Sequence, residues 1–198
     1  MKYENKFLEY FSKLQLFTAG DAKRYLSRLG ASEGYSRLLL HNLVNARKLE
    51  RLRKGVYTFS RNEAVSGFAF RPFYYGAEYA MTIRKIWTQQ SIPTIFTKSK
   101  ANPGIRTVAG LKVLIRRIAP SAFFGFEFLK YSGIFVPVAV PEKIILDLLY
   151  FRIRVDEETL SNLMNLVDVE TLGSYAARLG RLYVKRTENI IGEERKSP

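Results

Sequence analysis

Apolar residues in the first sixty positions follow helical spacing and then alternate. A helix is predicted over 5–14, where four apolar residues share one face: Phe7, Leu8, Phe11 and Leu14. Thr18 and Ser32 are residue types that cap helix N-termini, and they predict a second helix over 19–29 and a third running to about Lys48. A β-hairpin turning near Lys54-Gly55 follows, and its apolar side is Leu49, Leu52, Val56, Tyr57 and Phe59. Three helices followed by a hairpin are typical of a winged helix-turn-helix domain, which we expect over 1–60.

The rest of the chain has a strand pattern followed by a helix pattern. Residues 61–73 contain Gly67 and Pro72 without a clear period, and we predict a linker there. A helix is expected over 74–87, and stretches rich in β-branched and aromatic residues predict strands over 93–98, 107–118 and 123–140. Four further helices are expected after Pro141, Asp156, Asp168 and Gly180. The prediction is therefore an α+β protein, with a second domain over 74–191 and a disordered tail over 192–198.

The third helix has a polar face that could contact DNA. At about 100° per residue, Leu39, Leu40, Leu43 and Ala46 gather on one side of the helix, opposite most of the polar residues. No acidic residue lies between Arg37 and Lys48, and arginine and asparagine can pair with base edges. A solvated polar face is the alternative interpretation. With the hairpin cations added, the predicted DNA-binding residues are Ser36, Arg37, His41, Asn45, Lys48, Arg51, Arg53 and Lys54.

The charge balance favours a polyanionic partner. The 198 residues include 32 Lys+Arg and 18 Asp+Glu, a net charge of +14, which indicates nucleic acid or an anionic membrane surface. Residues 1–60 hold 12 basic and 5 acidic side chains, so this third of the chain carries +7. There is no cysteine, which excludes disulfides and thiolate metal sites. No segment resembles a signal peptide or a membrane span, so we expect a cytoplasmic protein that binds double-stranded DNA and no membrane.

A second group of cations occurs in the strand-rich region. The stretch from residue 98 to residue 117 contains no acid, and its basic residues predict a second phosphate-contacting surface: Lys98, Lys100, Arg106, Lys112, Arg116 and Arg117. The alternative is a sheet edge protected by cations.

Residues that could support catalysis are few. Glu142, Lys143 and Asp147 could belong to a metal-dependent nuclease, but Glu142 suits a helix's first turn, and Lys143 and Asp147 could pair on the helix surface. His41 is the only histidine, and no glycine loop of the phosphate-binding type is present. The aromatics of 70–79 could stack on bases, but we expect them to be buried at the domain junction. The prediction is a protein that is not an enzyme and has no cofactor and no metal site.

Several stretches also resemble a known family. They are "LERLRKGVY" (49–57), "FYYGAEYAM" (73–81), "FFGF" (123–126) and "VAVPEKIILDLLY" (138–150). In this order they resemble the AbiEi-type antitoxins of type IV toxin–antitoxin systems, over about residues 15–190. The resemblance implies a winged-helix transcriptional regulator that represses its own operon. It also implies a nucleotidyltransferase-like toxin that is counteracted functionally rather than in a stable complex. A stand-alone regulator, and a toxin-neutralising protein-interaction module without specific DNA binding, remain alternatives.

Overall fold

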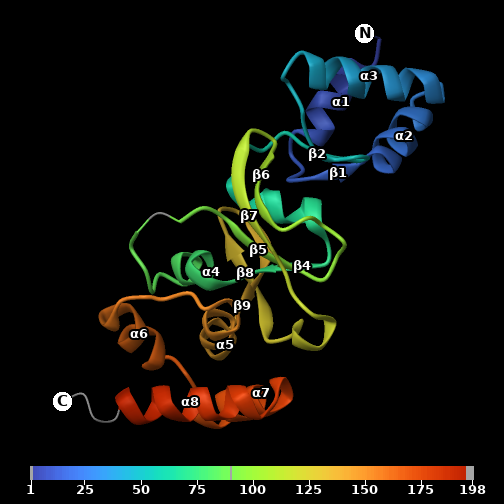
Figure 1. Cartoon of the computed structure of the whole chain (residues 1–198). Helices are drawn as coiled ribbons and strands as arrows, with labels where there is room; N and C mark the ends of the chain where they lie inside the picture. Colours follow the sequence, from blue (N-terminus) through green and yellow to red (C-terminus); the bar gives the residue numbers. More distant parts are fainter. Residues whose placement is uncertain (1, 90, 195–198) are drawn as a thin grey trace. The chain divides into compact units, whose positions relative to one another are not determined.

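The computed structural model describes residues 2–89 and 91–194, and it has a mixed α+β structure (Figure 1). Its contacts divide the chain into two compact units. The first unit comprises Met1–Ala69 and Arg106–Lys112, and the second comprises Phe70–Ile105 and Val113–Pro198.

The first unit combines three helices with a small antiparallel sheet. Its elements are α1 (Glu4–Phe11), β1 (Phe17–Thr18), α2 (Ala19–Arg28), α3 (Glu33–Asn45), β2 (Glu50–Arg53) and β3 (Val56–Thr58). The strand order is β1-β3-β2, with Phe17 opposite Tyr57. The short strand β1 is not predicted from the sequence. The core contains three packed phenylalanine rings (Phe7, Phe11 and Phe17), all at most 2% exposed, together with leucines from α2 and α3.

Side-chain caps fix where α2 and α3 begin. The Thr18 hydroxyl accepts the Asp21 N–H at 3.1 Å, while the Asp21 carboxylate accepts the Thr18 N–H at 2.9 Å, which forms a capping box. The Ser32 hydroxyl accepts the Tyr35 N–H at the start of α3. The end of α3 differs from the prediction, because the helix stops at Asn45 and Arg47 adopts a left-handed backbone with φ of 53°. Lys48 therefore lies after the helix, in the turn that leads into β2.

The segment predicted as a linker is folded. Residues Glu63–Phe70 form a 3-10 helix, η1, and Ala64 to Phe68 are buried in it. The boundary between the two units falls between Ala69 and Phe70, within the predicted linker range of 61–73.

The second unit contains most of a six-stranded mixed sheet of order β6-β7-β5-β4-β9-β8. The strands are β4 (Phe73–Tyr75), β5 (Thr94–Thr97), β6 (Gly104–Val108), β7 (Leu111–Arg117), β8 (Phe126–Tyr131) and β9 (Ile134–Ala139). The prediction of one helix over 74–87 is wrong at both ends, because Phe73–Tyr75 is a central strand and only Ala77–Ile83 forms the helix α4. Consecutive buried aromatics suit a strand with neighbours on both sides. Tyr74 and Tyr75 are fully buried within this unit and are not positioned to stack on bases.

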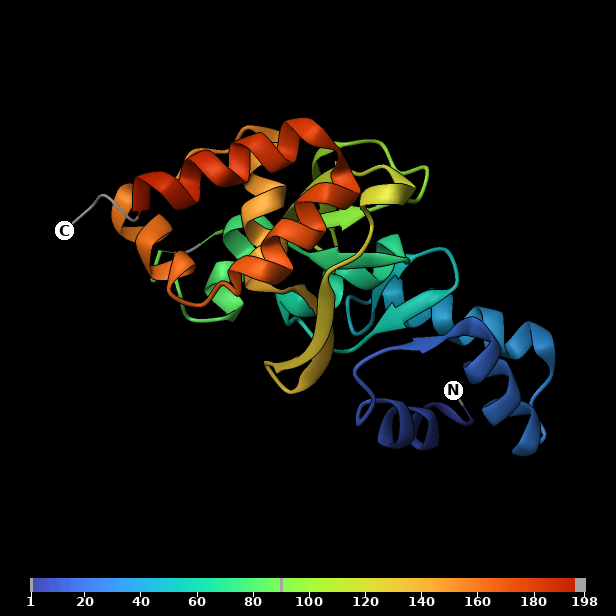
Figure 2. The ribbon, with the colours of Figure 1, turned by 90° about the horizontal axis from the view of Figure 1, so that it is seen from below.

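Four helices follow the sheet: α5 (Pro141–Phe151), α6 (Glu157–Met164), α7 (Val169–Leu179) and α8 (Arg181–Glu194). Both α7 and α8 pack against α5, and Figure 2 shows these helices from below. Residues 192–194 are helical although the sequence predicts a disordered tail from 192, and the remainder of that tail lies outside the described residues. In the described part of the chain, no helix combines the length and the apolar character needed to cross a membrane.

Candidate nucleic-acid interface

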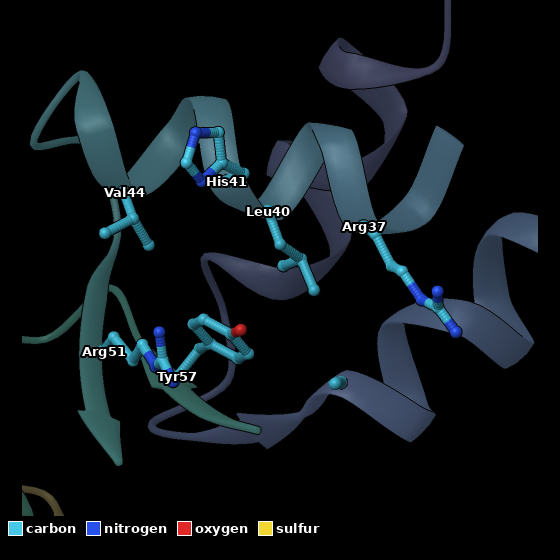
Figure 3. A pocket seen from close by; sticks show the side chains of 7 residues that line it. Arg37, Leu40, His41, Val44, Arg51 and Tyr57 are labelled. Carbon is cyan, nitrogen blue, oxygen red and sulfur yellow. The ribbon is translucent and has the colours of Figure 1, made fainter. Parts of the chain in front are cut away.

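A shallow hollow separates α3 from the β2–β3 hairpin in the first unit (Figure 3). Its volume is about 170 Å³, and it is lined by Ala19, Arg37, Leu40, His41, Val44, Arg51 and Tyr57. In Figure 3, Leu40 and Val44 point from α3 toward Tyr57 and Arg51 across the hollow. No carboxylate lines it, and its volume is below the roughly 300–1,000 Å³ of ordinary small-molecule pockets. The hollow is therefore suited to a single group, such as one phosphate or sugar, with cations around an apolar floor.

The outer face of α3 carries three of the predicted site residues. Arg37, His41 and Asn45 are exposed, while Leu39, Leu40 and Leu43 face the core. The Asn45 amide nitrogen lies 2.9 Å from His41 Nε2, so the two side chains form a hydrogen-bonded pair one turn apart. This pair orients both side chains on the surface of the helix.

The sequence prediction missed Leu38, which is 52% exposed on the same outer face. The helical period could have found it, because Leu38 is three positions before His41 and one turn from Asn42. An apolar side chain at this place can contact a thymine methyl group.

Arg37 is held by an acidic neighbour. Its guanidinium donates to Glu33 at 2.6 Å, and Glu33 also accepts from Lys23 at 2.7 Å. Lys23 chiefly, and Arg37 in addition, lower the pKa of the Glu33 carboxyl. Because the Arg37 side chain is 79% exposed, this ion pair is solvated and weak, and an incoming phosphate or base can displace Glu33.

The hairpin directs its cations outward. Leu52 is buried, and Arg51 and Arg53 on either side of it are exposed because alternate residues of a strand face opposite sides. The pairing of β2 with β3 is irregular between Arg51 and Arg53, and Gly55 turns the chain with a φ of 79°. Within the described residues, Arg51, Arg53 and Lys54 make no ion pair, so their charges are available to a ligand.

Two residues of the predicted set lie elsewhere. Ser36 is only 3% exposed, and its hydroxyl donates to the Ser32 carbonyl at 3.4 Å, so little of this side chain is accessible to a ligand. Ser36 lies on the inner side of α3, about 100° from Arg37, which the sequence prediction overlooked. Lys48 lies beyond the end of α3, and its Nζ is 3.8 Å from Glu4.

The second predicted basic set is divided between the two units. Arg106 and Lys112 belong to the first unit, whereas the remaining four residues belong to the second. Lys98, Lys100 and Arg117 are exposed, and the Lys98 ammonium lies over the Phe123 ring at 5.2 Å. Arg116 differs from the others because it is partly buried.

The residues considered for a nuclease are part of the fold of the second unit. The prediction of a surface pair is wrong: Lys143 and Asp147 are 1% and 0% exposed, because α5 is covered by the sheet on one side and by α7 and α8 on the other. Lys143 Nζ donates to Asp147, and the Tyr74 hydroxyl donates to the same carboxylate at 3.0 Å. Glu142 accepts the Asp168 N–H at 2.8 Å. Both carboxylates are thus occupied within the unit, and no cluster of three or more potential metal ligands occurs among the described residues.

Burial is the largest cause of the pKa shifts of Asp147 and of its hydrogen-bond partner Tyr74. It raises the pKa of Asp147 to about 6, against the opposing effects of Lys143 and Tyr74. Burial, and then the neighbouring Asp147 carboxylate, raise the pKa of the Tyr74 hydroxyl well above its usual value.

No model of a known protein family matches the chain, and no match to it is found among curated proteins.

Proposed function

We propose that Met1–Ala69 is a winged helix that binds double-stranded DNA, and that the protein is a transcriptional regulator. The order of elements supports this proposal: α1, β1, α2 and α3 are followed by a hairpin, and β1 completes a sheet of order β1-β3-β2. A short turn joins α2 to α3, as in helix-turn-helix proteins. In this arrangement α3 is the recognition helix and the β2–β3 hairpin is the wing.

The observation that carries the proposal is the convergence of α3 and the hairpin on one hollow. Arg37 and His41 from α3 and Arg51 from β2 line it. The helix is 13 residues long, about 20 Å, and a major groove about 12 Å wide admits it. In that position Arg37 would pair with guanine and Asn45 with adenine.

The wing supplies contacts that do not depend on base sequence. Arg53 and Lys54 are exposed and adjoin the turn at Gly55, so they can approach phosphates. Each phosphate contact releases counterions and makes DNA binding depend on salt concentration.

We extend the proposal to the antitoxin of a type IV toxin–antitoxin system that represses its own operon. The support for this finer assignment is the resemblance of stretches 49–57, 73–81, 123–126 and 138–150 to AbiEi-type antitoxins. Its partner would be a nucleotidyltransferase-like toxin, counteracted without a stable complex.

The DNA-binding proposal is tested by fluorescence anisotropy with the DNA upstream of the protein's own gene and a shuffled fragment. Arg37→Ala and Asn45→Ala should each weaken binding to the specific fragment by about 1–3 kcal/mol and leave binding to the shuffled one nearly unchanged. The double variant Arg53→Ala/Lys54→Ala should weaken binding to both fragments and reduce the salt slope by about 2.

The matched control is Lys6→Ala/Lys13→Ala, which removes two exposed charges of the same unit from positions away from the hollow. The proposal is wrong if the wing variant and this control bind both fragments equally tightly, with equal slopes, at several salt concentrations.

The antitoxin assignment needs a separate experiment. A nucleotidyltransferase-like gene adjacent to this one would be expressed from an inducible promoter, with and without this protein on a second plasmid. Growth should be restored by the wild-type protein. If DNA binding is specific but growth stays arrested, the protein is a regulator of another kind.

A further inference from the structure

A second hollow lies entirely within the second unit. Its volume is about 440 Å³, within the range of small-molecule sites, and it is lined by Pro103, Gly104, Leu114, Ile115, Arg116, Arg117 and Phe151. The lining comes from Pro103 and the first residue of β6, from the second half of β7 and from the last residue of α5. None of the predicted DNA-contacting residues of α3 or the wing takes part in it.

Arg116 is the unusual residue of this hollow. Its guanidinium lies over the Phe151 ring, with Cζ 4.9 Å from the ring centroid. Its Nε is buried, and the described residues offer it no hydrogen-bond acceptor. An arginine side chain stays protonated in proteins, so this N–H remains a hydrogen-bond donor without an acceptor. Buried polar groups are nearly always paired, and an unpaired one in a cavity wall points to a missing partner.

The chemistry of the lining specifies that partner. Two guanidinium groups contribute to the hollow and no carboxylate does, so the missing partner is an anion. The stacking of Arg116 on Phe151 holds the planar donor fork in place, which suits bidentate binding of a phosphate. Leu114, Ile115 and Phe151 supply an apolar wall for the rest of a ligand. Gly104 leaves the wall open, since a Cβ at this position would meet nothing within 4 Å.

We propose that this hollow binds a small phosphate ester carrying a planar ring, of the class of a nucleoside monophosphate. Arg116 and Arg117 bind the phosphate, and Phe151 and Leu114 contact the ring. A phosphate of the DNA backbone has the same anionic chemistry. Leu114, Ile115 and Phe151, however, give the hollow an apolar wall that a bare backbone phosphate would leave uncovered, which favours a free ligand with a ring. This site does not depend on DNA binding by the first unit.

The Arg116 Nε–H is the direct reporter of this site. In the full-length protein labelled with ¹⁵N, titration with adenosine 5′-monophosphate should shift its resonance saturably, inorganic phosphate should shift it more weakly, and adenosine should leave it unchanged. The resonance is assigned by its loss in Arg116→Met. In calorimetry, Arg116→Met should bind adenosine 5′-monophosphate about 10-fold to 100-fold more weakly than wild type. Arg154→Met, which removes an exposed arginine outside the hollow, should bind like wild type.

Two results would overturn the proposal. The first is the absence of a saturable shift with either phosphate probe, or equal affinity of Arg116→Met and Arg154→Met for the nucleotide. The second is a shift produced only by a short duplex DNA, which would make the ligand a backbone phosphate. If Arg116→Met fails to fold, the wild-type titration and the variant Phe151→Leu still decide the question, since Phe151→Leu should also weaken nucleotide binding. The wing variants report on DNA binding separately, so the two proposals can fail independently.

Discussion

Gly125 should be one of the least replaceable residues of the second unit. Its φ is 71°, in the left-handed region, and a Cβ there would lie 2.9 Å from a ring carbon of Tyr175 and 3.0 Å from the Lys143 Cβ. The left-handed backbone costs a residue with a Cβ about 1–2 kcal/mol, and crowding in a packed core costs about 1–3 kcal/mol. Gly125→Ala should therefore lower the free energy of unfolding by about 2–5 kcal/mol.

Three other glycines separate the two contributions. Gly55 has a φ of 79° and open space around it, so Gly55→Ala should cost only the backbone term, about 1–2 kcal/mol. Gly76 has an ordinary φ of −135°, but a Cβ would lie 2.6 Å from the Phe96 ring, so Gly76→Ala should cost only the crowding term, about 1–3 kcal/mol. Gly173 lies in α7 without a left-handed backbone and without an atom within 4 Å of the position that a Cβ would take. Gly173→Ala should therefore raise the free energy of unfolding by about 0.5–1 kcal/mol, because alanine favours a helix more than glycine does.

The assay is urea unfolding followed by tryptophan fluorescence. The only tryptophan, Trp87, lies in the second unit and is partly buried, so its emission reports the unfolding of that unit. Gly55 belongs to the first unit, and its variant is followed by circular dichroism. If Gly125→Ala unfolds at the same urea concentration as Gly173→Ala, the close contacts to Tyr175 and Lys143 do not exist in solution and the reasoning fails.

Three further predictions concern buried and capping groups. The native Asp147 carboxyl has a pKa of about 6, against 3.8 in the unfolded chain, so between these two values the native protein binds a proton that the unfolded chain has lost. The free energy of unfolding should therefore fall as the pH rises from about 4 to about 6. Urea midpoints across this range should show that slope in wild type, and Asp147→Asn should lack it. Tyr74→Phe should lower the free energy of unfolding by about 1.5–3 kcal/mol, measured by Trp87 fluorescence, since it removes a hydrogen bond to a buried carboxylate; a change below 0.5 kcal/mol (roughly the scatter of surface substitutions) would contradict the contact. Thr18→Ala should cost about 1 kcal/mol in thermal unfolding of the first unit, because it removes the cap of α2, and an unchanged midpoint would refute the capping box.

The sequence predicts the helices of the first unit well because their starts depend on local chemistry. Thr18 and Ser32 cap α2 and α3 through their own hydroxyl groups, so the residue type alone locates each start. The end of α3 is harder to predict, because a left-handed residue at Arg47 rather than a glycine turns the chain. Strand β1 is two residues long and exists only through its pairing with β3, which no local pattern reveals.

The errors in the second unit arise where packing decides the outcome. The residues of β4 have no local signal that separates a central strand from a buried helix, and neighbouring strands β5 and β9 determine the difference. The spacing of Lys143 and Asp147 predicts their pairing, and they do pair. Spacing cannot predict that α7 and α8 cover this side of α5, so the pair becomes buried instead of exposed. The stacking of Arg116 on Phe151 joins residues 35 positions apart, and no sequence pattern marks it.

Whether a cationic side chain already has a partner within the protein distinguishes a structural role from a binding role better than its charge alone does. Arg84 donates to the Ala139 carbonyl and to Glu127, both at 2.7 Å, and Lys143 donates to Asp147, so each of these two cations has a partner within the second unit. Arg53 has no ion pair among the described residues, and it is exposed, so water already solvates it and a phosphate gains mainly by releasing counterions. Arg116 has a buried Nε without an acceptor among the described residues, and its side chain lines a hollow that no carboxylate neutralises, so a binding role explains it better than a structural one. Binding at the wing should therefore weaken steeply with salt, and binding at the Arg116 hollow should depend on salt much less.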